Sequence, residues 1–400
     1  MIVDNARLKI LVVSTSFPLS TDSYSGIFVK RIIDHLPTDM HVTVLTPAAD
    51  REFTTTSSAN ISVVKFRYAP ASLQILANRP GGIPAALRTN RLNYLLLPFF
   101  LGAMLFQTWR LGRHHDVIHA NWAICGFIGG IAGKLLNRPV IASFMGSDVM
   151  LAQTSRPHRL LLEFCLRQLN HVVCVSNDMR AGICRAYPQY AEKLSVITNG
   201  VDSSLLNFHR NYGERELPVI ISVGSLVPVK GYDITLRALS AISDRIKFRF
   251  LCIGDGSEKP ALQAMAGAGG LEDAVIFRGA VAPERVYQEM YNADIFILSS
   301  RSEGMPNVML EAMACALPVI ASNIDGVAEV IHHQENGLLF EKENAGQLAG
   351  LIELLAASSE LRERLGNSAR LTIQRSNMTW NSTAAAYLQI YRRVTGKAAG

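Results

Sequence analysis

The sequence predicts an α/β protein with two doubly wound domains, each a parallel sheet covered by helices on both faces. Three observations lead to this prediction. The chain has 400 residues, which is more than one hydrophobic core usually holds and favours two domains. Short apolar runs rich in Val and Ile alternate with helical segments, as in parallel sheets. Hydrophobic residues make up 49% of the chain and charged residues 18%, so both domains should be globular.

The first domain should begin with a strand at residues 8–14, followed by a turn at 16–18 and a helix that starts after Gly26. Residues 1–13 contain an acid and lack a long apolar core and a cleavage site, so we expect a first strand there and no signal peptide. The alternation then continues. Further strands are expected at 41–46, 61–68, 117–120, 140–144, 172–176 and 194–198, and helices at 123–136, 158–169 and 177–186.

The polar segment 201–217 has no apolar periodicity and is the best candidate for an interdomain linker. The second domain then repeats the alternation of strand and helix, and the chain should end in two helical segments. Strands are expected at 219–224, 248–253, 275–277, 295–298 and 318–321, and the last helices at 345–374 and 380–394.

The stretch 295–321 carries the strongest functional signal. Its apolar strand leads into a polar turn at 299–304, and Pro306 is expected at the first helical position, where an N–H would be unpaired anyway. The amides that open this helix should face the carboxyl end of the sheet, where a helix N-terminus attracts phosphate. They belong to Asn307, Val308 and Met309. An anionic ligand is therefore expected here.

Two carboxylates frame this helix start, Glu303 in the turn and Glu311 in the helix. Ionised carboxylates only accept hydrogen bonds, so beside a phosphate site they suit the hydroxyls of a sugar and a ribose. The E-x7-E pattern within SEGMPNVMLEAMACALPVIAS resembles the donor-site signature of retaining glycosyltransferase family 4, the group 1 glycosyl transferases of GT-B fold. In that family the first glutamate contacts the transferred sugar and the second the ribose. Residues 325–329 resemble its glycine-rich stretch near the sugar and phosphates.

The resemblance implies a GT-B architecture, with two Rossmann-like domains whose parallel sheets face each other across a cleft. It implies an acceptor domain at 1–205, a nucleotide-sugar donor domain at 206–380, and a C-terminal helix at 381–400 that packs back on the first domain. The NGVD turn at 199–202 resembles the family's junction between the domains.

The same resemblance assigns further donor-side residues. The loop after the strand at 219–224 ends in Lys230, whose charge suits a diphosphate. The family usually has an arginine where this chain has Ser225, which leaves the Ser225 hydroxyl and the helix terminus to support Lys230. A GDG turn begins at Gly254, and Arg278 belongs to the element whose backbone would read the base. The implied donor-binding set is Gly224, Ser225, Lys230, Gly254, Arg278, Glu303, Gly304, Met305, Asn307, Val308 and Glu311, and the implied catalytic set is Glu303, Lys230, Asn121 and His119.

The acceptor side is matched more loosely. Gly26 stands where relatives keep a small residue that lets donor and acceptor approach the backbone. Asn121 replaces the second histidine of an H-x-H pattern, and Met145 the histidine of an HGSD pattern. Asn121 can hydrogen-bond sugar hydroxyls but does not titrate near neutral pH. For His119, the alternative to a catalytic role is a structural role in the core. Asp148 is either an acceptor-side residue or a helix N-cap.

Charge and cysteine usage bear on partners and location. Residues 1–205 hold 20 Lys or Arg against 12 Asp or Glu, and residues 53–115 hold seven basic residues and no acid. This favours an anionic partner or surface.

The apolar segment 91–110 is either a core helix of the first domain or an interfacial helix anchored by Trp109 and its flanking arginines. The six cysteines form no C-x-x-C pair, which predicts reduced thiols and a cytoplasmic protein, with the inner face of the membrane as an alternative location.

The family resemblance, together with these features, implies metal-independent, retaining transfer of a sugar from a UDP- or GDP-linked donor to a carbohydrate, lipid-linked or other hydroxyl acceptor, in polysaccharide, glycolipid or other glycoconjugate biosynthesis. The chain has no D-x-D pattern, so no divalent cation or other cofactor is expected, and no nucleic acid partner. A nucleotide-sugar epimerase of similar fold is one alternative. A weakly catalytic nucleotide-sugar-binding protein is another, suggested by Asn121, Met145 and Ser225. A glycoside hydrolase using the two glutamates would explain neither Lys230 nor the helix terminus.

Overall fold

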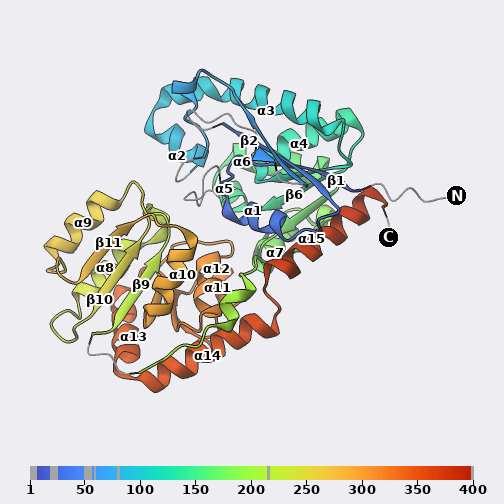
Figure 1. Ribbon diagram of the computed structural model, residues 1–400. Coiled ribbons are helices and arrows are strands. Elements are labelled where there is room, and N and C mark those ends of the chain that lie inside the picture. The colour runs from blue at the N-terminus through green and yellow to red at the C-terminus, as the bar shows by residue number, and fades with distance from the viewer. Residues whose placement is uncertain are drawn as a thin grey trace. The chain divides into compact units, whose positions relative to one another are not determined.

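The computed structural model describes residues 7–18, 26–48, 56–57, 60–78, 82–213 and 217–397. The chain divides into two compact units (Figure 1). Unit 1 comprises Met1–Thr198 and Asn381–Gly400, and unit 2 comprises Asn199–Trp380. Each unit is built around its own, largely parallel sheet.

The sheet of unit 1 has eight strands in the order β3-β4-β2-β1-β5-β6-β7-β8. All neighbouring strands are parallel except β3 and β4 at one edge. Strands β5 and β6 are buried along their whole length, as expected where helices cover both faces. The strands are β1 (Lys9–Val13), β2 (His41–Pro47), β3 (Thr56–Ser57), β4 (Ile61–Phe66), β5 (Val117–Asn121), β6 (Val140–Phe144), β7 (His171–Cys174) and β8 (Leu194–Val196).

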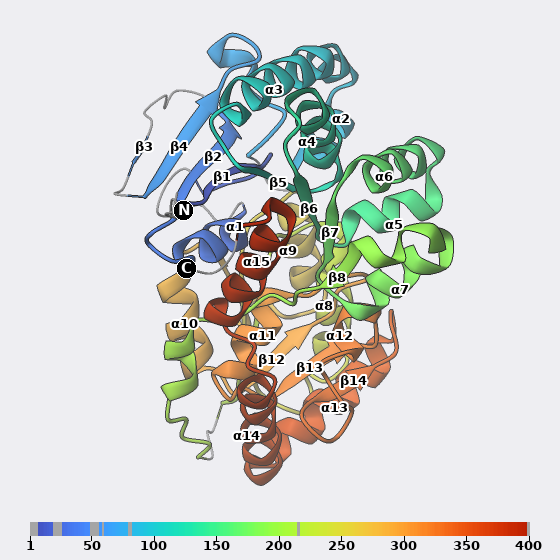
Figure 2. The ribbon, with the colours of Figure 1, turned by 90° about the vertical axis from the view of Figure 1, so that its right-hand side faces the viewer.

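The helices of unit 1 cover this sheet (Figure 2). Helices α4 and α7 begin and end where the sequence predicts, and the N-cap of α7, Ser176, accepts a hydrogen bond from the Met179 amide at 3.3 Å. Helix α5 is not among the predicted elements, because its eight residues are too few for a clear period. The helices are α1 (Ile27–Asp34), α2 (Gly82–Thr89), α3 (Leu97–Gly112), α4 (Ala123–Leu136), α5 (Ser147–Thr154), α6 (Arg156–Gln168), α7 (Asn177–Ala186) and α15 (Trp380–Thr395), with the 3-10 helices η1 (Ala71–Leu73), η2 (Arg91–Leu96) and η3 (Pro188–Lys193).

Two buried tyrosines anchor the C-terminal helix α15 in unit 1. The Tyr391 hydroxyl lies 2.7 Å from Nδ1 of His119 on β5. The Tyr387 hydroxyl lies 2.8 Å from Ser143 Oγ on β6, and this oxygen lies 2.8 Å from His119 Nε2. Because these buried polar groups satisfy one another, they fix a single position of α15 on the sheet.

A second polar contact holds the last turns of α15. The guanidinium of Arg393 lies 3.0 Å from Nδ1 of His171, and Nε2 of His171 lies 2.8 Å from Ser195 Oγ. An arginine can only donate, so Nδ1 accepts and the imidazole is neutral. Burial, together with the charge of Arg393, lowers the pKa of His171 to about 4.

The sheet of unit 2 has six parallel strands in the order β11-β10-β9-β12-β13-β14. The strands are β9 (Val219–Val223), β10 (Arg249–Ile253), β11 (Val275–Gly279), β12 (Ile295–Leu298), β13 (Val319–Ser322) and β14 (Leu338–Phe340). Strand β14 is not among the predicted elements. The helices are α8 (Tyr232–Ser240), α9 (Lys259–Ala268), α10 (Pro283–Asn292), α11 (Asn307–Ala314), α12 (Asp325–Ala328), α13 (Ala345–Ala357) and α14 (Ser359–Arg375), with the 3-10 helices η4 (Ser203–Asn207) and η5 (Pro228–Lys230).

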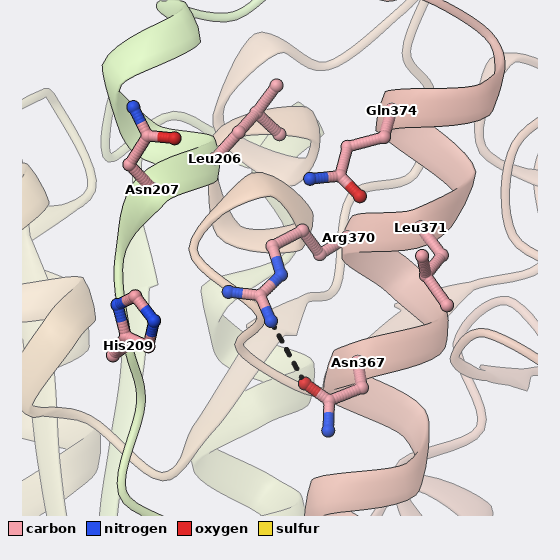
Figure 3. A pocket seen from close by; sticks show the side chains of 7 residues that line it. All are labelled: Leu206, Asn207, His209, Asn367, Arg370, Leu371 and Gln374. Atoms are coloured by element: carbon pink, nitrogen blue, oxygen red, sulfur yellow. Dashed lines mark hydrogen bonds between the residues drawn. The ribbon is translucent and has the colours of Figure 1, made fainter.

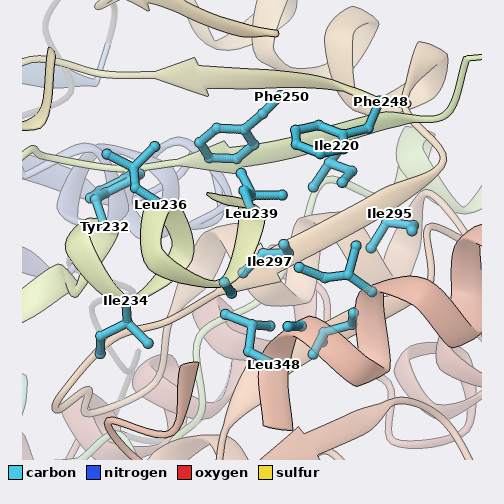
Figure 4. Packing of buried hydrophobic residues seen from close by; sticks show 14 of the residues in the cluster. Ile220, Tyr232, Ile234, Leu236, Leu239, Phe248, Phe250, Ile295, Ile297 and Leu348 are labelled. Atoms are coloured by element: carbon cyan, nitrogen blue, oxygen red, sulfur yellow. The ribbon is translucent and has the colours of Figure 1, made fainter. Parts of the chain in front are cut away.

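The hydrophobic core of unit 2 packs helices α8 and α13 against the central strands (Figure 4). Ile220 of β9, Phe250 of β10 and Ile297 of β12 are at most 1% exposed. Leu239 of α8 and Leu348 of α13 are fully buried against them. Dense packing of this kind resists small displacements, so the ends of these strands hold the loops that follow them at fixed positions.

The segment predicted as a linker belongs to unit 2. Arg210 donates hydrogen bonds to the carbonyls of Met290 at 2.6 Å and Cys315 at 3.1 Å, and the Tyr212 hydroxyl donates to the Ala316 carbonyl at 2.6 Å. The border between the units therefore follows Thr198 instead of residue 205. Sequence reasoning missed this because the contacts are made by polar side chains that show no periodicity.

The helical segments differ from prediction at two further places. The long helix expected at 345–374 is divided at Ser358, whose backbone is extended and whose hydroxyl caps the Leu361 amide at 3.1 Å. The helix expected at 91–110 begins as the 3-10 helix η2 and becomes α-helical only at Leu97. Only 22% of its most apolar 18-residue window is buried, so the segment is not enclosed as a core helix of unit 1 would be.

The neutral state of His171 predicts that unit 1 loses stability in mild acid. Its pKa is about 4 in the folded protein and about 6.5 in an unfolded chain, so the stabilisation is present above pH 6.5 and is lost as the pH falls towards 4. Replacing His171 by Gln should reduce the difference in free energy of unfolding between pH 7 and pH 5 by about 1–2 kcal/mol. Urea-induced unfolding measures this, with the exposed His114→Gln as control. Equal pH dependence in His171→Gln and the parent protein would refute the prediction.

Candidate active site

Each sheet has one point at which its strand order reverses. In unit 2 the chain runs outward from β9 to β10 and β11 and then resumes with β12 on the other side of β9. In unit 1 it runs outward from β1 and resumes with β5 on the other side. Loops that follow adjacent strands diverge at such a point, and ligands of α/β proteins bind in the resulting crevice at the carboxyl ends of the strands. The predicted residues cluster on these loops.

The two loops at the reversal point of unit 2 meet in an ion pair. Lys230 Nζ, after β9, lies 2.6 Å from Glu303 Oε1, after β12, although the residues are 73 positions apart. Ser300 Oγ donates a hydrogen bond to the same carboxylate oxygen at 2.6 Å. The side chains of Lys230 and Glu303 are 29% and 11% exposed, respectively, so both charges are held in place yet remain accessible to a small ligand.

Backbone contacts fix the loop that carries Lys230. Ser299 Oγ donates to the Gly231 carbonyl at 2.8 Å, and Thr235 Oγ1 donates to Ser299 Oγ at 2.8 Å. Gly231 has φ of 64°, and a Cβ atom there would lie 2.1 Å from the Ser299 carbonyl oxygen. Only glycine fits this approach. The position of Lys230 is therefore set by the end of β12.

Arg301 adds a charged clamp to the same two loops. Its guanidinium contacts both carboxylate oxygens of Asp233, at 2.8 and 2.9 Å, and Glu343 at 2.6 Å, and it also donates to the Pro228 carbonyl. Its own amide donates to the Val229 carbonyl at 2.7 Å. Burial raises the pKa of Asp233, but the hydrogen bonds and charge of Arg301 outweigh it, and the net pKa of Asp233 is lowered. The positive charge of Arg301 is thus already neutralised.

The turn that carries Glu303 is packed from a second side by α12. A Cβ atom on Gly326 would lie 1.9 Å from the Gly304 carbonyl oxygen and 3.2 Å from that of Glu303. The glycine at position 326 therefore allows the backbone of 325–328 to touch the turn directly. This is the stretch whose glycine the family resemblance places near the sugar and phosphates.

The predicted glycines after β9 and β10 are also in backbone contact. Gly254 has φ of 139°, and a Cβ atom there would lie 1.9 Å from the Gly224 carbonyl oxygen. The Gly254 amide donates to the Gly279 carbonyl at 2.9 Å. Ser225 and Arg278 are exposed beside these turns, and Arg278 Nε lies 3.9 Å from Glu289.

The N-terminus of α11 differs in detail from the prediction. Pro306 is the N-cap, with extended backbone, and the helix begins at Asn307. The Met309 amide donates to the Pro306 carbonyl at 3.1 Å, so it is not available to a ligand. The amides of Asn307 and Val308 precede the first helical hydrogen bond. Among the described residues, the buried Oδ1 of Asn307 has no hydrogen-bond partner, which is unusual for a buried polar atom.

Glu311 is placed on the first turns of α11 and is held by a tyrosine. The Tyr287 hydroxyl, from α10, donates to Glu311 Oε1 at 3.2 Å. Met305, the other predicted residue of the turn, is buried, and its carbonyl lies 3.5 Å from the side-chain nitrogen of Asn199. Glu303 and Glu311 therefore have separate partners at the two ends of one short segment.

In unit 1, Asn121 is the predicted residue with the strongest structural signal. It ends β5 at the reversal point and is 0% exposed. Neither its Oδ1 nor its Nδ2 has a hydrogen-bond partner among the described residues. The next residue, Trp122, has φ of 68°, which is rare for a large side chain, and its ring packs edge-on against Phe28. Gly26, before Phe28, approaches the Ser16 carbonyl so closely that a Cβ atom would lie 2.1 Å from it.

Two other residues predicted for unit 1 are placed differently. His119 is 2% exposed, both its nitrogens are hydrogen-bonded, and burial lowers its pKa to about 3. The prediction of a catalytic His119 is therefore corrected to a structural role under α15. Asp148 lies in α5, and its side chain is outside the described part of the structure.

Comparisons with known proteins decide the family. Residues 207–372 match the family model of glycosyl transferases group 1, and residues 25–205 match that of Glycosyltransferase Family 4. Spore coat protein SA of Bacillus subtilis is 31% identical over 255 residues, which cover 58% of this chain and 67% of the relative. The chain belongs to the group 1, family 4 glycosyltransferases.

Solved structures show the fold of this glycosyltransferase. Sucrose-phosphate synthase from Thermosynechococcus elongatus is similar with a TM-score of 0.82 and 21% identity, covering 98% of this chain and 100% of that chain. Anabaena HepE in complex with UDP-glucose is similar with a TM-score of 0.74 and 21% identity, covering 96% and 100%. The predicted α/β class with two Rossmann-like domains and the family resemblance are confirmed.

Four residues around the candidate site of the glycosyltransferase were not predicted: Asp233, Tyr287, Ser300 and Arg301. Their contacts join elements distant in sequence, which no local spacing reveals. The turn at 299–304 did contain a signal, because it holds Arg301 only two residues before Glu303 at an expected anion site.

One described cavity of unit 2 lies away from the predicted residues. It measures about 470 Å³ and lies between η4 and α14, where Arg370 donates to Asn367 (Figure 3). No predicted donor residue lines it. In the described parts of the chain, no cluster of three or more His, Cys, Asp or Glu residues could hold a metal ion.

The contact between Gly326 and the turn of Glu303 predicts a sensitive position. Gly326→Ala should lower the free energy of unfolding by about 1–3 kcal/mol, because the new Cβ forces two backbone segments apart. The control is Gly350→Ala in the exposed face of α13, where a Cβ meets nothing within 4 Å and the higher helix propensity of alanine should stabilise by about 0.5–1 kcal/mol. Thermal unfolding of the two variants should therefore shift in opposite directions. A melting temperature of Gly326→Ala equal to or above that of the parent protein would disprove the close contact.

Proposed function

We propose that this glycosyltransferase moves a sugar from a nucleoside diphosphate sugar to an acceptor hydroxyl, with retention of configuration at the anomeric carbon. The observation that carries the proposal is the ion pair of Lys230 and Glu303 beside the N-terminus of α11. It places a cation, a carboxylate and helix amides at one reversal point. A diphosphate linked to a sugar is the ligand that needs all three.

Lys230 and the amides of Asn307 and Val308 would stabilise the leaving diphosphate. Negative charge develops on this group as the bond to the sugar breaks, and fixed positive groups stabilise that charge without rearranging. Lys230 is paired with Glu303. A diphosphate would compete for Lys230, and the released Glu303 oxygen would accept hydrogen bonds from sugar hydroxyls while Ser300 keeps the carboxylate oriented.

Glu311 would bind the ribose of the donor. Tyr287 already donates to one of its oxygens, which fixes the carboxylate and leaves acceptor capacity for the ribose hydroxyls. The backbone around Arg278 and Gly279 would contact the base. The complex of Anabaena HepE with UDP-glucose supports a UDP-linked sugar as the first donor to test, with a GDP-linked sugar as the second.

Asn121 would bind hydroxyl groups of a ligand at the reversal point of unit 1. Its two side-chain polar atoms have no partner among the residues that the structure describes, and their burial is costly unless a ligand supplies hydroxyls. Because an amide does not titrate, the attacking hydroxyl would transfer its proton to the departing phosphate oxygen on the same face of the sugar. This step needs no protein nucleophile. We further propose that the reaction needs no divalent cation, since the chain has no D-x-D pattern, and that it contributes to glycoconjugate synthesis in the cytoplasm.

Ligand-induced stabilisation tests the donor site. We expect UDP or GDP compounds to raise the melting temperature, because a ligand of the folded state stabilises it by about 2.7 kcal/mol at one hundred times its Kd. The rise should be equal with and without magnesium, because the proposed site uses no divalent cation. Glu311→Gln should reduce this shift, whereas Glu360→Gln, an exposed acid on α14, should keep it. Failure of every nucleotide and nucleotide sugar to shift the melting temperature would overturn the proposed donor site.

Turnover then separates transfer from its alternatives. The donor found in the thermal assay is incubated with and without a panel of hydroxyl acceptors, and free nucleotide is measured. Release that depends on an acceptor supports transfer. Conversion of the donor to an isomeric nucleotide sugar would identify an epimerase, and binding without turnover across the panel would identify a binding protein.

A further inference from the structure

One continuous stripe of exposed residues runs along η2 and α3, which lie on the outside of unit 1 beside α4 (Figures 1 and 2). The stripe residues recur every three or four positions, so they share one face. Its apolar part is highly exposed: Leu92, Leu95, Phe99 and Phe106 are 68%, 67%, 66% and 56% exposed. The stripe consists of Leu92, Leu95, Phe99, Gly102, Phe106, Arg110 and Arg113.

The opposite face of α3 is firmly packed into unit 1. Phe100 and Met104 are fully buried, and the ring of Phe100 contacts those of Phe66 on β4 and Tyr68. Of the most apolar 18-residue window of Arg91–Gly112, only 22% is buried, and its mean hydropathy is 1.3. By length and composition this helix could cross a membrane. Its packed face ties it to the sheet, however, so it can only lie along a surface.

The positive charge of this segment indicates the kind of surface that it binds. Arg91 begins the segment, and Arg110 and Arg113 end the stripe. The chain has no Asp or Glu from residue 53 to residue 115. The Arg113 guanidinium lies over the ring of Trp109, 3.5 Å from its centre, which places an aromatic ring beside the positive end of the stripe. Apolar side chains framed by arginines, with Tyr94 and Trp109 nearby, are typical of helices that lie in the interface of a bilayer.

We propose that this stripe docks on the surface of an anionic lipid bilayer. The apolar side chains enter the boundary between headgroups and acyl chains, and the arginines bind lipid phosphates. A second copy of the chain suits the stripe less well, because its charges are all positive and two stripes in contact would repel. The inference does not depend on the proposed reaction, since it concerns binding alone.

Gly102 offers a precise probe because it lies in the middle of the stripe. A Cβ atom there meets nothing within 4 Å, so any side chain can be accommodated without disturbing the fold. In sedimentation with vesicles that contain phosphatidylglycerol, Gly102→Glu should reduce the bound fraction by roughly tenfold relative to the parent protein, and Gly102→Leu should raise it. The control is Gly350→Glu on α13 of unit 2, which makes the same change in charge at an equally open helical glycine and should bind as the parent does.

Lipid composition and salt complete the test. Binding should fall when phosphatidylcholine replaces the anionic lipid and when salt is raised, because both weaken attraction to the arginines. The proposal is overturned if the parent protein binds neither kind of vesicle, or if Gly102→Glu and Gly350→Glu bind equally. Concentration-dependent dimers that dissociate in Gly102→Glu, without vesicle binding, would assign the stripe to a second copy instead.

Discussion

Lys230 and Glu303 can form an ion pair because β9 and β12 end side by side, with no strand between them. The hydrogen bond from the Ser299 hydroxyl to the Gly231 carbonyl fixes one loop on the other. Glycines at 231 and 326 permit the backbone approaches on which this arrangement depends. The site thus draws its geometry from parallel strand pairing, and its chemistry from two side chains that the pairing brings together.

Arg301 shows why the number of basic residues near the site is a poor guide to its charge. The arginine is closest in sequence to Glu303, but Asp233 and Glu343 bind its guanidinium from two sides. Arg301 holds the loop that carries Lys230. Because two carboxylates already neutralise its charge, it is not available to bind a phosphate. The position usually occupied by an arginine in the family holds Ser225, which is exposed. In the proposed reaction, Lys230 would therefore bind the diphosphate with helix amides as its main support.

The strands and most helices could be predicted because buried positions hold apolar residues. This gives the continuous apolar run of β12 and the largely apolar helix α4. Motif resemblance placed Glu303 and Lys230 in one predicted site, but it did not predict their ion pair, since no local pattern joins residues 73 positions apart. Other features depend on details that a sequence pattern does not contain. The cap by Pro306 removes one predicted amide, the extended backbone of Ser358 divides a helix, and Arg210 converts a polar segment into part of unit 2.

The surroundings of Asn121 explain how an amide can stand where relatives have a histidine. His119, two residues earlier on the same strand, has its pKa lowered to about 3 by burial. A neutral imidazole can only donate or accept hydrogen bonds, and Asn121 is as deeply buried as His119. An asparagine amide offers the same two capacities from a shorter side chain. Asn121 itself cannot titrate near neutral pH, so under the proposed function the role of position 121 is to orient hydroxyl groups.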